Sequence, residues 1–289
     1  MRHIVKQTAH RQHQWFNRKQ RLIKPPVSVY SAGSAGIWRA GLREIVTLTG
    51  MVLVSSPLKE YDKRIEILTR EQGRIPAFAQ GARKQSSALS ACIVPFTFGE
   101  YQVYEGRNSY SLKSGIITSY FGSLADDYDL LCYASYFTEI ARYLTRENVR
   151  ADGELLLLYI TFKALQAGKV PLKLIRRIFE LRFMAIQGEA PGVFACVRCG
   201  NTEAYNVYMA EGGLLCEECQ RKDIQLKGHY PVKLSADARY ALQYIISSPF
   251  EKLYSFNLSE NVMAEVDRFM EKYIARYLPH HFKSAEFLL

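Results

Sequence analysis

Hydrophobic and polar residues alternate in short runs from about residue 44 to residue 120. A period of two, interrupted by glycine and polar turn residues, is typical of half-buried β-strands. We expect a turn centred on Gly73 and a bulge or kink at Gly50, inside a strand. The expected strands are EIVTLTGMVLV (44–54), KRIEILT (63–69), IPAFAQG (75–81), YQVYEG (101–106) and SYSLKSGIITSY (109–120). Because closure removes exposed strand edges, such strands predict a small closed or partly open barrel.

The apolar pattern changes to a helical period at Ser123 and keeps it in most of the remaining chain. Ser123 is the expected N-cap of the first helix, with Asp126 in the capping-box position. Gly168 should end the second helix, and Pro171 should begin the third. The expected helices span residues 123–144, 154–167, 171–187, 235–247 and 258–278. The apolar face of the last helix comprises Val262, Val266, Phe269, Met270, Tyr273, Ile274 and Tyr277.

Composition is typical of a folded soluble protein, since 48% of the 289 residues are hydrophobic and 23% are charged. This length suits about two domains. The longest apolar run, residues 155–160, is far shorter than the roughly 20 residues that span a bilayer. The first part of the chain shows no compact apolar core of a signal peptide. We therefore expect a cytoplasmic protein without disulfides.

Positive charge is concentrated in residues 1–43, which hold nine Lys or Arg and no Asp or Glu. The rest of the chain carries 29 basic and 28 acidic residues, so nearly all of the net charge of +10 belongs to this segment. It shows no sustained periodicity, and we expect it to be disordered. Three interpretations stay open: translated sequence upstream of the true start codon, a cleaved transit peptide, or a basic arm that binds nucleic acid.

Two Cys-x-x-Cys pairs, sixteen residues apart, contain Cys196, Cys199, Cys216 and Cys219. Two intervening residues let both thiolates of a pair reach one tetrahedral ion, so the spacing predicts zinc. Gly200 suits the positive-φ position of such a turn, and Gly212-Gly213 is the expected turn of a hairpin between the pairs. Four thiolates leave no open position for catalysis. We expect one structural Zn²⁺ that clips this hairpin.

Sequence patterns for catalysis are absent. The chain contains no Gly-x-x-x-x-Gly-Lys-Ser/Thr, Gly-x-Gly-x-x-Gly or His-Glu-x-x-His motif. An ATP-driven mechanism therefore has no visible phosphate-binding loop, and we expect a protein that is not an enzyme and takes no nucleotide cofactor.

Three stretches resemble one known family. They are residues 61–91, with the turn LTREQG and the loop GARK, the four cysteines, and the C-terminal HHFKSAEFL (280–288). Over residues 44–289 the chain resembles the RecO family of bacterial recombination-mediator proteins. The cysteines are the least general of these features, because not every member of that family keeps them.

The resemblance implies an α+β, multidomain fold. An OB-fold β-barrel is expected at residues 44–122, followed by an α-helical domain at 123–289 that carries the four-cysteine zinc hairpin as an insertion at 194–222. Residues 1–43 have no counterpart in the family pattern.

The resemblance also implies a function in DNA repair, DNA damage and DNA recombination. Members of the family bind single- and double-stranded DNA and anneal complementary strands without ATP. The implied partners are RecR and the C-terminal tail of the single-stranded-DNA-binding protein, with loading of RecA as the outcome, in the cytoplasm at the bacterial nucleoid and without a membrane. A second interpretation stays open, namely a protein–protein interaction scaffold whose DNA affinity is incidental.

Basic residues cluster on or beside the expected barrel strands, with Tyr61 and Phe78 nearby. Together they supply phosphate neutralisation and base stacking, the two requirements of an OB-type DNA groove. The alternative is that these charges are solvated and deter edge-to-edge aggregation. The DNA-binding candidates are Arg64, Arg70, Arg74, Arg83 and Lys84.

A second basic group lies beside apolar positions of the expected helices. An acidic, hydrophobic partner tail would need an apolar pocket with a basic rim. The alternative is ordinary surface charge near helix C-termini. The candidates for binding the partner tail are Arg142, Arg146, Arg176 and Arg177.

Overall fold

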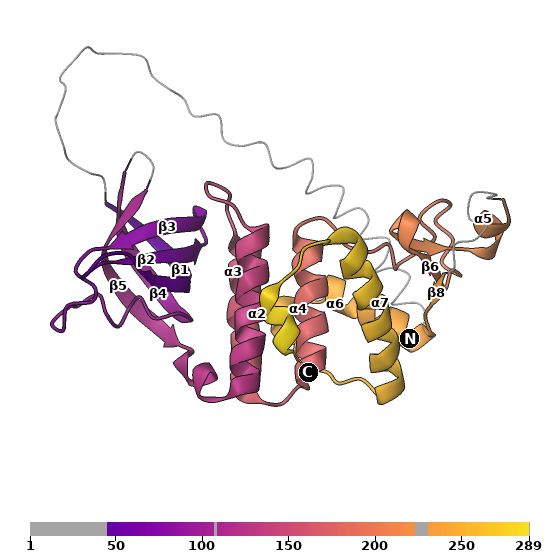
Figure 1. Cartoon of the computed structure of the whole chain (residues 1–289). Coiled ribbons are helices and arrows are strands. Elements are labelled where there is room, and N and C mark those ends of the chain that lie inside the picture. The colour runs from indigo at the N-terminus through magenta and orange to yellow at the C-terminus, as the bar shows by residue number, and fades with distance from the viewer. Residues whose placement is uncertain (1–44, 107–108, 223–230, 289) are drawn as a thin grey trace, which may run out of the picture. The chain divides into compact units, whose positions relative to one another are not determined.

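The structure is a computed structural model that describes residues 45–106, 109–222 and 231–288 (Figure 1). These residues belong to one compact unit. The expectations for residues 1–43 fall outside the described residues. Among the described helices, none is both long and apolar enough to cross a membrane.

Five strands form a closed barrel in the order β1-β2-β3-β5-β4 (Figure 1). They are β1 (Ile45–Pro57), β2 (Lys63–Thr69), β3 (Gly73–Ala79), β4 (Thr97–Glu105) and β5 (Tyr110–Tyr120). Pairing is antiparallel except between β3 and β5, whose parallel contact closes the barrel. This is an OB-type arrangement, and the predicted barrel is confirmed.

Alternating residues of the strands fill the barrel interior, which explains the period-two pattern. The interior includes Leu48, Val52, Ile65, Ile67, Ile75, Ala77, Tyr101, Val103 and Leu112. The predicted bulge at Gly50 is wrong, because the register between β1 and β2 shifts between Val52 and Val54. Gly50 instead permits a close approach of the two strands. A Cβ there would lie 2.6 Å from the carbonyl oxygen of Leu68.

A helical region follows the barrel. Its main helices are α2 (Tyr128–Leu144), α3 (Asp152–Ala167), α4 (Leu172–Ile186), α6 (Ala236–Ser247) and α7 (Glu260–Tyr277), and its 3₁₀ turns include η1 (Gly122–Asp126), η4 (Phe250–Lys252) and η5 (Lys283–Phe287). Helices α4, α6 and α7 pack against one another (Figure 1). Gly168 ends α3 with a left-handed conformation, as predicted.

The predicted capping of the first helix is wrong. Asp127, not Ser123, is the N-cap of α2, and its carboxylate accepts a hydrogen bond from the backbone N–H of Leu130 at 3.0 Å. Ser123 and Asp126 lie in η1. The hydroxyl of Ser123 accepts a hydrogen bond from Gln166 of α3 at 2.9 Å, so a tertiary contact occupies the atom that would have capped the helix.

The turn between β2 and β3 docks onto the segment that joins α2 to α3. The backbone N–H of Asn148 donates to the carbonyl of Gln72 at 2.9 Å, and that of Arg74 donates to Arg146 at 3.2 Å. Gly73 has a φ of +65°, and a Cβ at this position would lie 2.1 Å from the carbonyl oxygen of Arg146. Only glycine permits both this backbone conformation and this contact.

Glu66 adds an ionic contact to the same junction. Its carboxylate accepts two hydrogen bonds from Arg142 of α2, at 2.9 and 3.0 Å, and one from Arg74 of β3 at 3.2 Å. Burial alone would raise the pKa of Glu66, but the hydrogen bond and charge of Arg142, together with those of Arg74, lower the pKa below its usual value.

Glu66→Gln should lower the free energy of unfolding at neutral pH by about 1–3 kcal/mol, because two guanidinium groups lose their countercharge. A carboxyl with a lowered folded-state pKa stabilises the fold above its unfolded pKa of about 4.3, and this contribution is lost as pH falls through the folded-state value. The variant should therefore be less sensitive to acid than the wild type. Denaturant unfolding measured across this pH range tests both effects.

Glu100→Gln is the matched control, since Glu100 is an exposed carboxylate on β4 with no ion pair among the described residues. Equal losses of stability in the two variants would contradict the role of Glu66 at the junction.

Candidate metal centre and nucleic-acid interface

The cysteine segment folds as a small hairpin between α4 and α6. Strands β6 (Asn206–Tyr208) and β7 (Gly213–Leu215) pair antiparallel, and β8 (Val232–Lys233) adds a third strand. Gly212 adopts a φ of +67° at the turn, in agreement with the predicted hairpin. The first cysteine pair precedes β6, while the second lies at the start of α5 (Glu217–Lys222).

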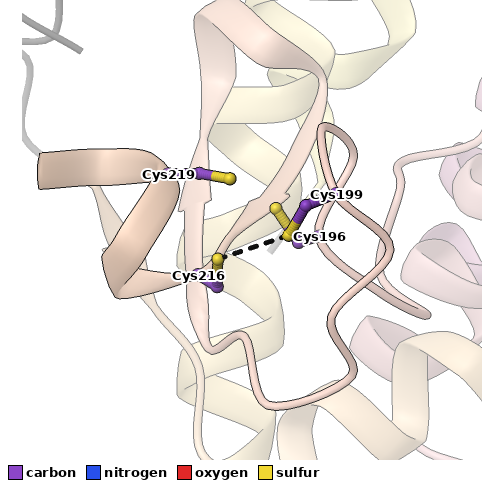
Figure 2. Close-up of side chains that lie close together, drawn as sticks. All are labelled: Cys196, Cys199, Cys216 and Cys219. Atoms are coloured by element: carbon purple, nitrogen blue, oxygen red, sulfur yellow. Dashed lines mark hydrogen bonds between the residues drawn. The ribbon is translucent and has the colours of Figure 1, made fainter. Parts of the chain in front are cut away.

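The four cysteine sulfurs converge on one point (Figure 2). Their Sγ atoms all lie within 4.8 Å of one another, and those of Cys199 and Cys216 are 3.5 Å apart. Zn–S bonds of about 2.3 Å in a tetrahedron place thiolates roughly 3.8 Å apart, so the spacing fits one such ion. Gly200 has the predicted positive φ, +76°, and its N–H donates to the carbonyl of Cys196 at 2.9 Å. The cluster can hold a metal ion.

The pKa values of the thiols also indicate that a cation is needed for all four to ionise. Burial alone would raise the pKa of Cys196, but backbone N–H groups of Cys216, Cys199 and Arg198 outweigh it and lower the pKa to about 6. Hydrogen bonding with Cys199 raises the pKa of Cys219 to about 12. Four converging thiols cannot all ionise without a positive charge between them, and a divalent metal supplies that charge.

Arg239 of α6 organises the loop that carries the first cysteine pair. This buried guanidinium donates hydrogen bonds to the carbonyls of Val193, Thr202 and Ala204, at 2.9, 2.8 and 3.0 Å, and to Phe194. Sequence reasoning missed this residue. The available signal was an arginine beside Ala238 on the apolar face of a predicted helix, where a cation needs buried partners.

The tip of the hairpin is held by the last long helix. The hydroxyl of Tyr277 donates to the carbonyl of Met209 at 2.7 Å. At the base, the hydroxyl of Tyr273 donates to the backbone carbonyl of Glu189 at 3.3 Å. The hairpin that carries the cysteines is therefore attached to α7 as well as to α6.

Two loops meet at one end of the barrel and gather several cations. The loop after β3 lies against residues 58–62, because the backbone N–H of Arg83 donates to the carbonyl of Tyr61 at 2.9 Å and its guanidinium donates to the carbonyl of Lys59 at 3.0 Å. The ammonium of Lys84 lies 5.7 Å from the centroid of the exposed Tyr61 ring. Lys59 was missed by sequence reasoning. Its signal was its position beside Tyr61 between two predicted strands.

The remaining barrel candidates separate into two environments. Arg64 is exposed on β2, directly opposite Phe78 of β3, near the same end of the barrel. Arg70 pairs with Glu71 at 2.8 Å. Arg74 pairs with Glu66 at the junction with α2. The structure thus brings Arg64, Arg83 and Lys84 to one end of β2 and β3, and Arg70 and Arg74 to the other.

The four arginines of the helical region are also separated. Arg142 pairs with Glu66, and Arg146 is exposed in the segment that contacts Gly73. Arg177 is only 3% exposed. It donates to Glu180 at 2.9 Å and to Asp267 of α7.

Arg176 lies at the rim of a groove of about 410 Å³, whose apolar lining includes Ile274 and Leu278 of the C-terminal region. Glu180 accepts hydrogen bonds from Arg176 at 2.8 Å and from Tyr136 at 2.6 Å, and these contacts fix the arginine in place.

Comparison with known proteins agrees with this architecture. A family model described as "Recombination protein O N terminal" matches residues 43–121, and one described as "Recombination protein O C terminal" matches residues 125–286. The chain is similar to "DNA repair protein RecO" of Acetivibrio thermocellus, 30% identical over 243 residues, which cover 83% of this chain and 94% of the relative. Relatives of the same name from Alkaliphilus metalliredigens and Symbiobacterium thermophilum are 27% and 28% identical, over 84% of this chain and 98% and 96% of their own lengths.

Proposed function

The chain belongs to the recombination protein O family of DNA repair proteins, and on that premise we propose that it is a DNA-binding recombination mediator. In this proposal it binds single- and double-stranded DNA and anneals complementary single strands without ATP. It is not an enzyme, since its contribution is to hold strands and partners together. The family resemblance supports RecR as a partner and loading of RecA as the outcome.

The observation that carries the proposal is the pair of loops at the end of the barrel. The ammonium of Lys84 lies over the exposed ring of Tyr61 there, and Arg83 contacts the backbone carbonyls of Tyr61 and Lys59. OB-folds bind oligonucleotides on strands 2 and 3 and on the loop between strands 1 and 2. Lys59 and Tyr61 lie in that loop, and Arg83 and Lys84 lie in the loop after β3 that docks against it. Cations neutralise phosphates and the aromatic ring offers a stacking surface for a base. Arg64 and Phe78 extend this surface along β2 and β3.

The other barrel arginines have a different part in this proposal. Arg70 contributes less to DNA binding, because its charge is already paired with Glu71. Arg74 serves the junction through Glu66 rather than the DNA surface. DNA affinity should therefore depend most on Arg64, Arg83 and Lys84.

We propose that the cysteine cluster holds one structural Zn²⁺. The support is the spacing of the four sulfurs and the closed set of four thiolates, which leaves no position for a substrate. When bound, the ion would hold the two ends of the hairpin together, while Arg239 and Tyr277 fix the hairpin to α6 and α7.

We further propose that the groove beside Arg176 receives the acidic, hydrophobic C-terminal tail of the single-stranded-DNA-binding protein. Ile274 and Leu278 supply apolar surface, and Arg176 supplies a positive charge at the rim. Arg177 also lines the groove and is held in place by its ion pairs with Glu180 and Asp267. Arg142 and Arg146 lie at the barrel junction, so we assign them no part in this groove.

Arg83→Ala with Lys84→Ala should weaken binding of single strands to a similar extent for different sequences. The slope of log affinity against log salt should become shallower by up to about 0.7 for each phosphate that the variant no longer neutralises. Fluorescence anisotropy of a labelled oligonucleotide over a series of salt concentrations measures both quantities. Lys169→Ala with Lys173→Ala, two exposed lysines of the helical region, is the charge-matched control. A double variant with the affinity and slope of the wild type would assign this loop to solvent.

Freshly purified protein should contain one zinc per chain, and Cys216→Ser should lose it because three thiolates cannot complete the tetrahedron. Hydrogen exchange should then increase in residues 190–222, while DNA binding is largely kept. Metal analysis and exchange mass spectrometry test this, with Cys132→Ala as the control, since Cys132 lies in α2 outside the cluster. Wild-type protein without zinc would contradict the assignment.

Ala275→Glu should weaken binding of a peptide with the partner's acidic tail sequence by tenfold or more, because the added carboxylate enters the groove and repels the tail. Ala275 is exposed, so folding should be kept. Ala264→Glu places the same charge on α7 away from this groove and should bind the peptide as the wild type does. Equal peptide affinities of both variants, measured by calorimetry, would show that the tail binds elsewhere.

A further inference from the structure

Helix α7 separates its charges onto two flanks. Asp267 and Glu271 lie on the flank that faces Arg177 of α4, with N···O distances of 2.5 and 3.6 Å. Arg268, Lys272 and Arg276 follow one another at intervals of four residues and are all exposed. At about 1.5 Å of rise per residue, this interval makes a row of cations roughly 6 Å apart.

The cations of this row lack ion-pair partners in the described part of the chain. In residues 45–106, 109–222 and 231–288, no carboxylate pairs with Arg268, Lys272 or Arg276. Glu265, on the same flank, accepts a hydrogen bond at 2.7 Å from the backbone N–H of Ser235, the N-cap of α6. Its carboxylate therefore has a structural contact of its own.

Folding does not account for this row. Like charges four residues apart on a helix repel each other and destabilise it. A position near the helix C-terminus favours Arg276 alone, because the helix dipole acts mainly within the last turn. The two arginines and the lysine together therefore suit an anionic ligand better than they suit the fold.

A groove continues the row beyond its N-terminal end. Lys233 of β8, Asn261 and Arg268 line a depression of about 610 Å³, together with Glu265, whose carboxylate accepts the hydrogen bond from Ser235. Lys233 adds a fourth exposed cation, also without an ion pair in the described part of the chain. The basic surface thus extends from β8 along α7 toward the hairpin tip, where Tyr277 contacts Met209.

We propose that Lys233, Arg268, Lys272 and Arg276 form a second binding site for the phosphate backbone of a nucleic-acid strand. The ligand class follows from the form of the surface: an extended row of point charges fits a regular polyanion, whose affinity comes from release of its counterions. The proposal rests on the function proposed above, because annealing requires two strands to be held at once.

The second site lies on elements other than those that carry the first. The barrel contacts α2 and α3 through Glu66 and the turn at Gly73, whereas α7 packs against α4 and α6. One strand can therefore bind at the loops of the barrel and another along α7. Their charges would be screened by separate sets of cations.

The test uses the full chain and two non-complementary oligonucleotides that carry a donor and an acceptor dye. Wild-type protein should bind both strands at once and bring the two dyes close together, which is detected as energy transfer. Arg268→Ala with Lys272→Ala and Arg276→Ala should keep binding of one strand and lose the transfer signal. Annealing of complementary strands should slow at least tenfold, and the salt slope for the second strand should fall by up to about 2, at about 0.7 per phosphate.

The control removes the same amount of charge elsewhere, by Lys169→Ala with Lys173→Ala and Lys252→Ala, and should behave as the wild type does. A row variant that keeps both transfer and annealing, or a control that loses them equally, would overturn the second site. If the row variant loses binding to the single-stranded-DNA-binding protein but keeps the energy-transfer signal, the row is a protein contact and the second DNA site is overturned. Wild-type protein that binds one strand without transfer would overturn the second site alone. If it binds no strand, the proposed function fails as well.

Discussion

The contact of the β2–β3 turn with the segment between α2 and α3 joins the barrel to the helical region at one end of these strands, and the opposite end stays exposed. At one end of these two strands, Gly73 lets the backbone reach Arg146, and Glu66 accepts hydrogen bonds from Arg142 of α2 and Arg74 of β3. At the other end lie the loops that carry Tyr61 and Arg83. Each strand is only seven residues long, so a short, paired ribbon separates the proposed DNA surface from the junction with the helices. The charged groups that join the barrel to the helices, Glu66, Arg74 and Arg142, are thus distinct from the cations proposed to bind DNA.

The helical region separates structural charges from exposed ones in the same way. Arg177 and Arg239 are buried, and each has several acceptors: carboxylates for Arg177 and backbone carbonyls for Arg239. The first supports the groove beside Arg176 and the second supports the loop of the cysteine cluster. Exposed cations such as Arg268 have no such partners among the described residues. Burial and pairing therefore separate the arginines that stabilise the fold from the exposed cations that remain available for phosphates.

The sequence predicted those features that depend on neighbours along the chain. Alternation gave the barrel strands, helical periodicity gave the buried face of α7 with Val266 and Phe269, and the cysteine spacing gave the cluster. Features that depend on distant partners could not be predicted. Arg142, a predicted tail-binding residue, and Glu66 are 76 residues apart, so the sequence could not show that they pair at the junction. Ser123 matched a capping sequence, yet its hydroxyl accepts a hydrogen bond from Gln166 of α3, and Asp127 caps the helix. A local sequence pattern cannot show which partner a side chain will bind, because the competing partner comes from another helix or strand.

The rate at which the intact chain anneals complementary strands, bare and coated with the single-stranded-DNA-binding protein, tests the mediator account most directly. The account predicts acceleration on both substrates without ATP and a fall in rate with salt, because phosphate contacts weaken as counterions accumulate. With coating protein that lacks its acidic tail, coated strands should resist annealing while bare strands anneal as before. Strict dependence on ATP, or no acceleration on bare strands, would contradict the account and favour a scaffold whose DNA affinity is incidental.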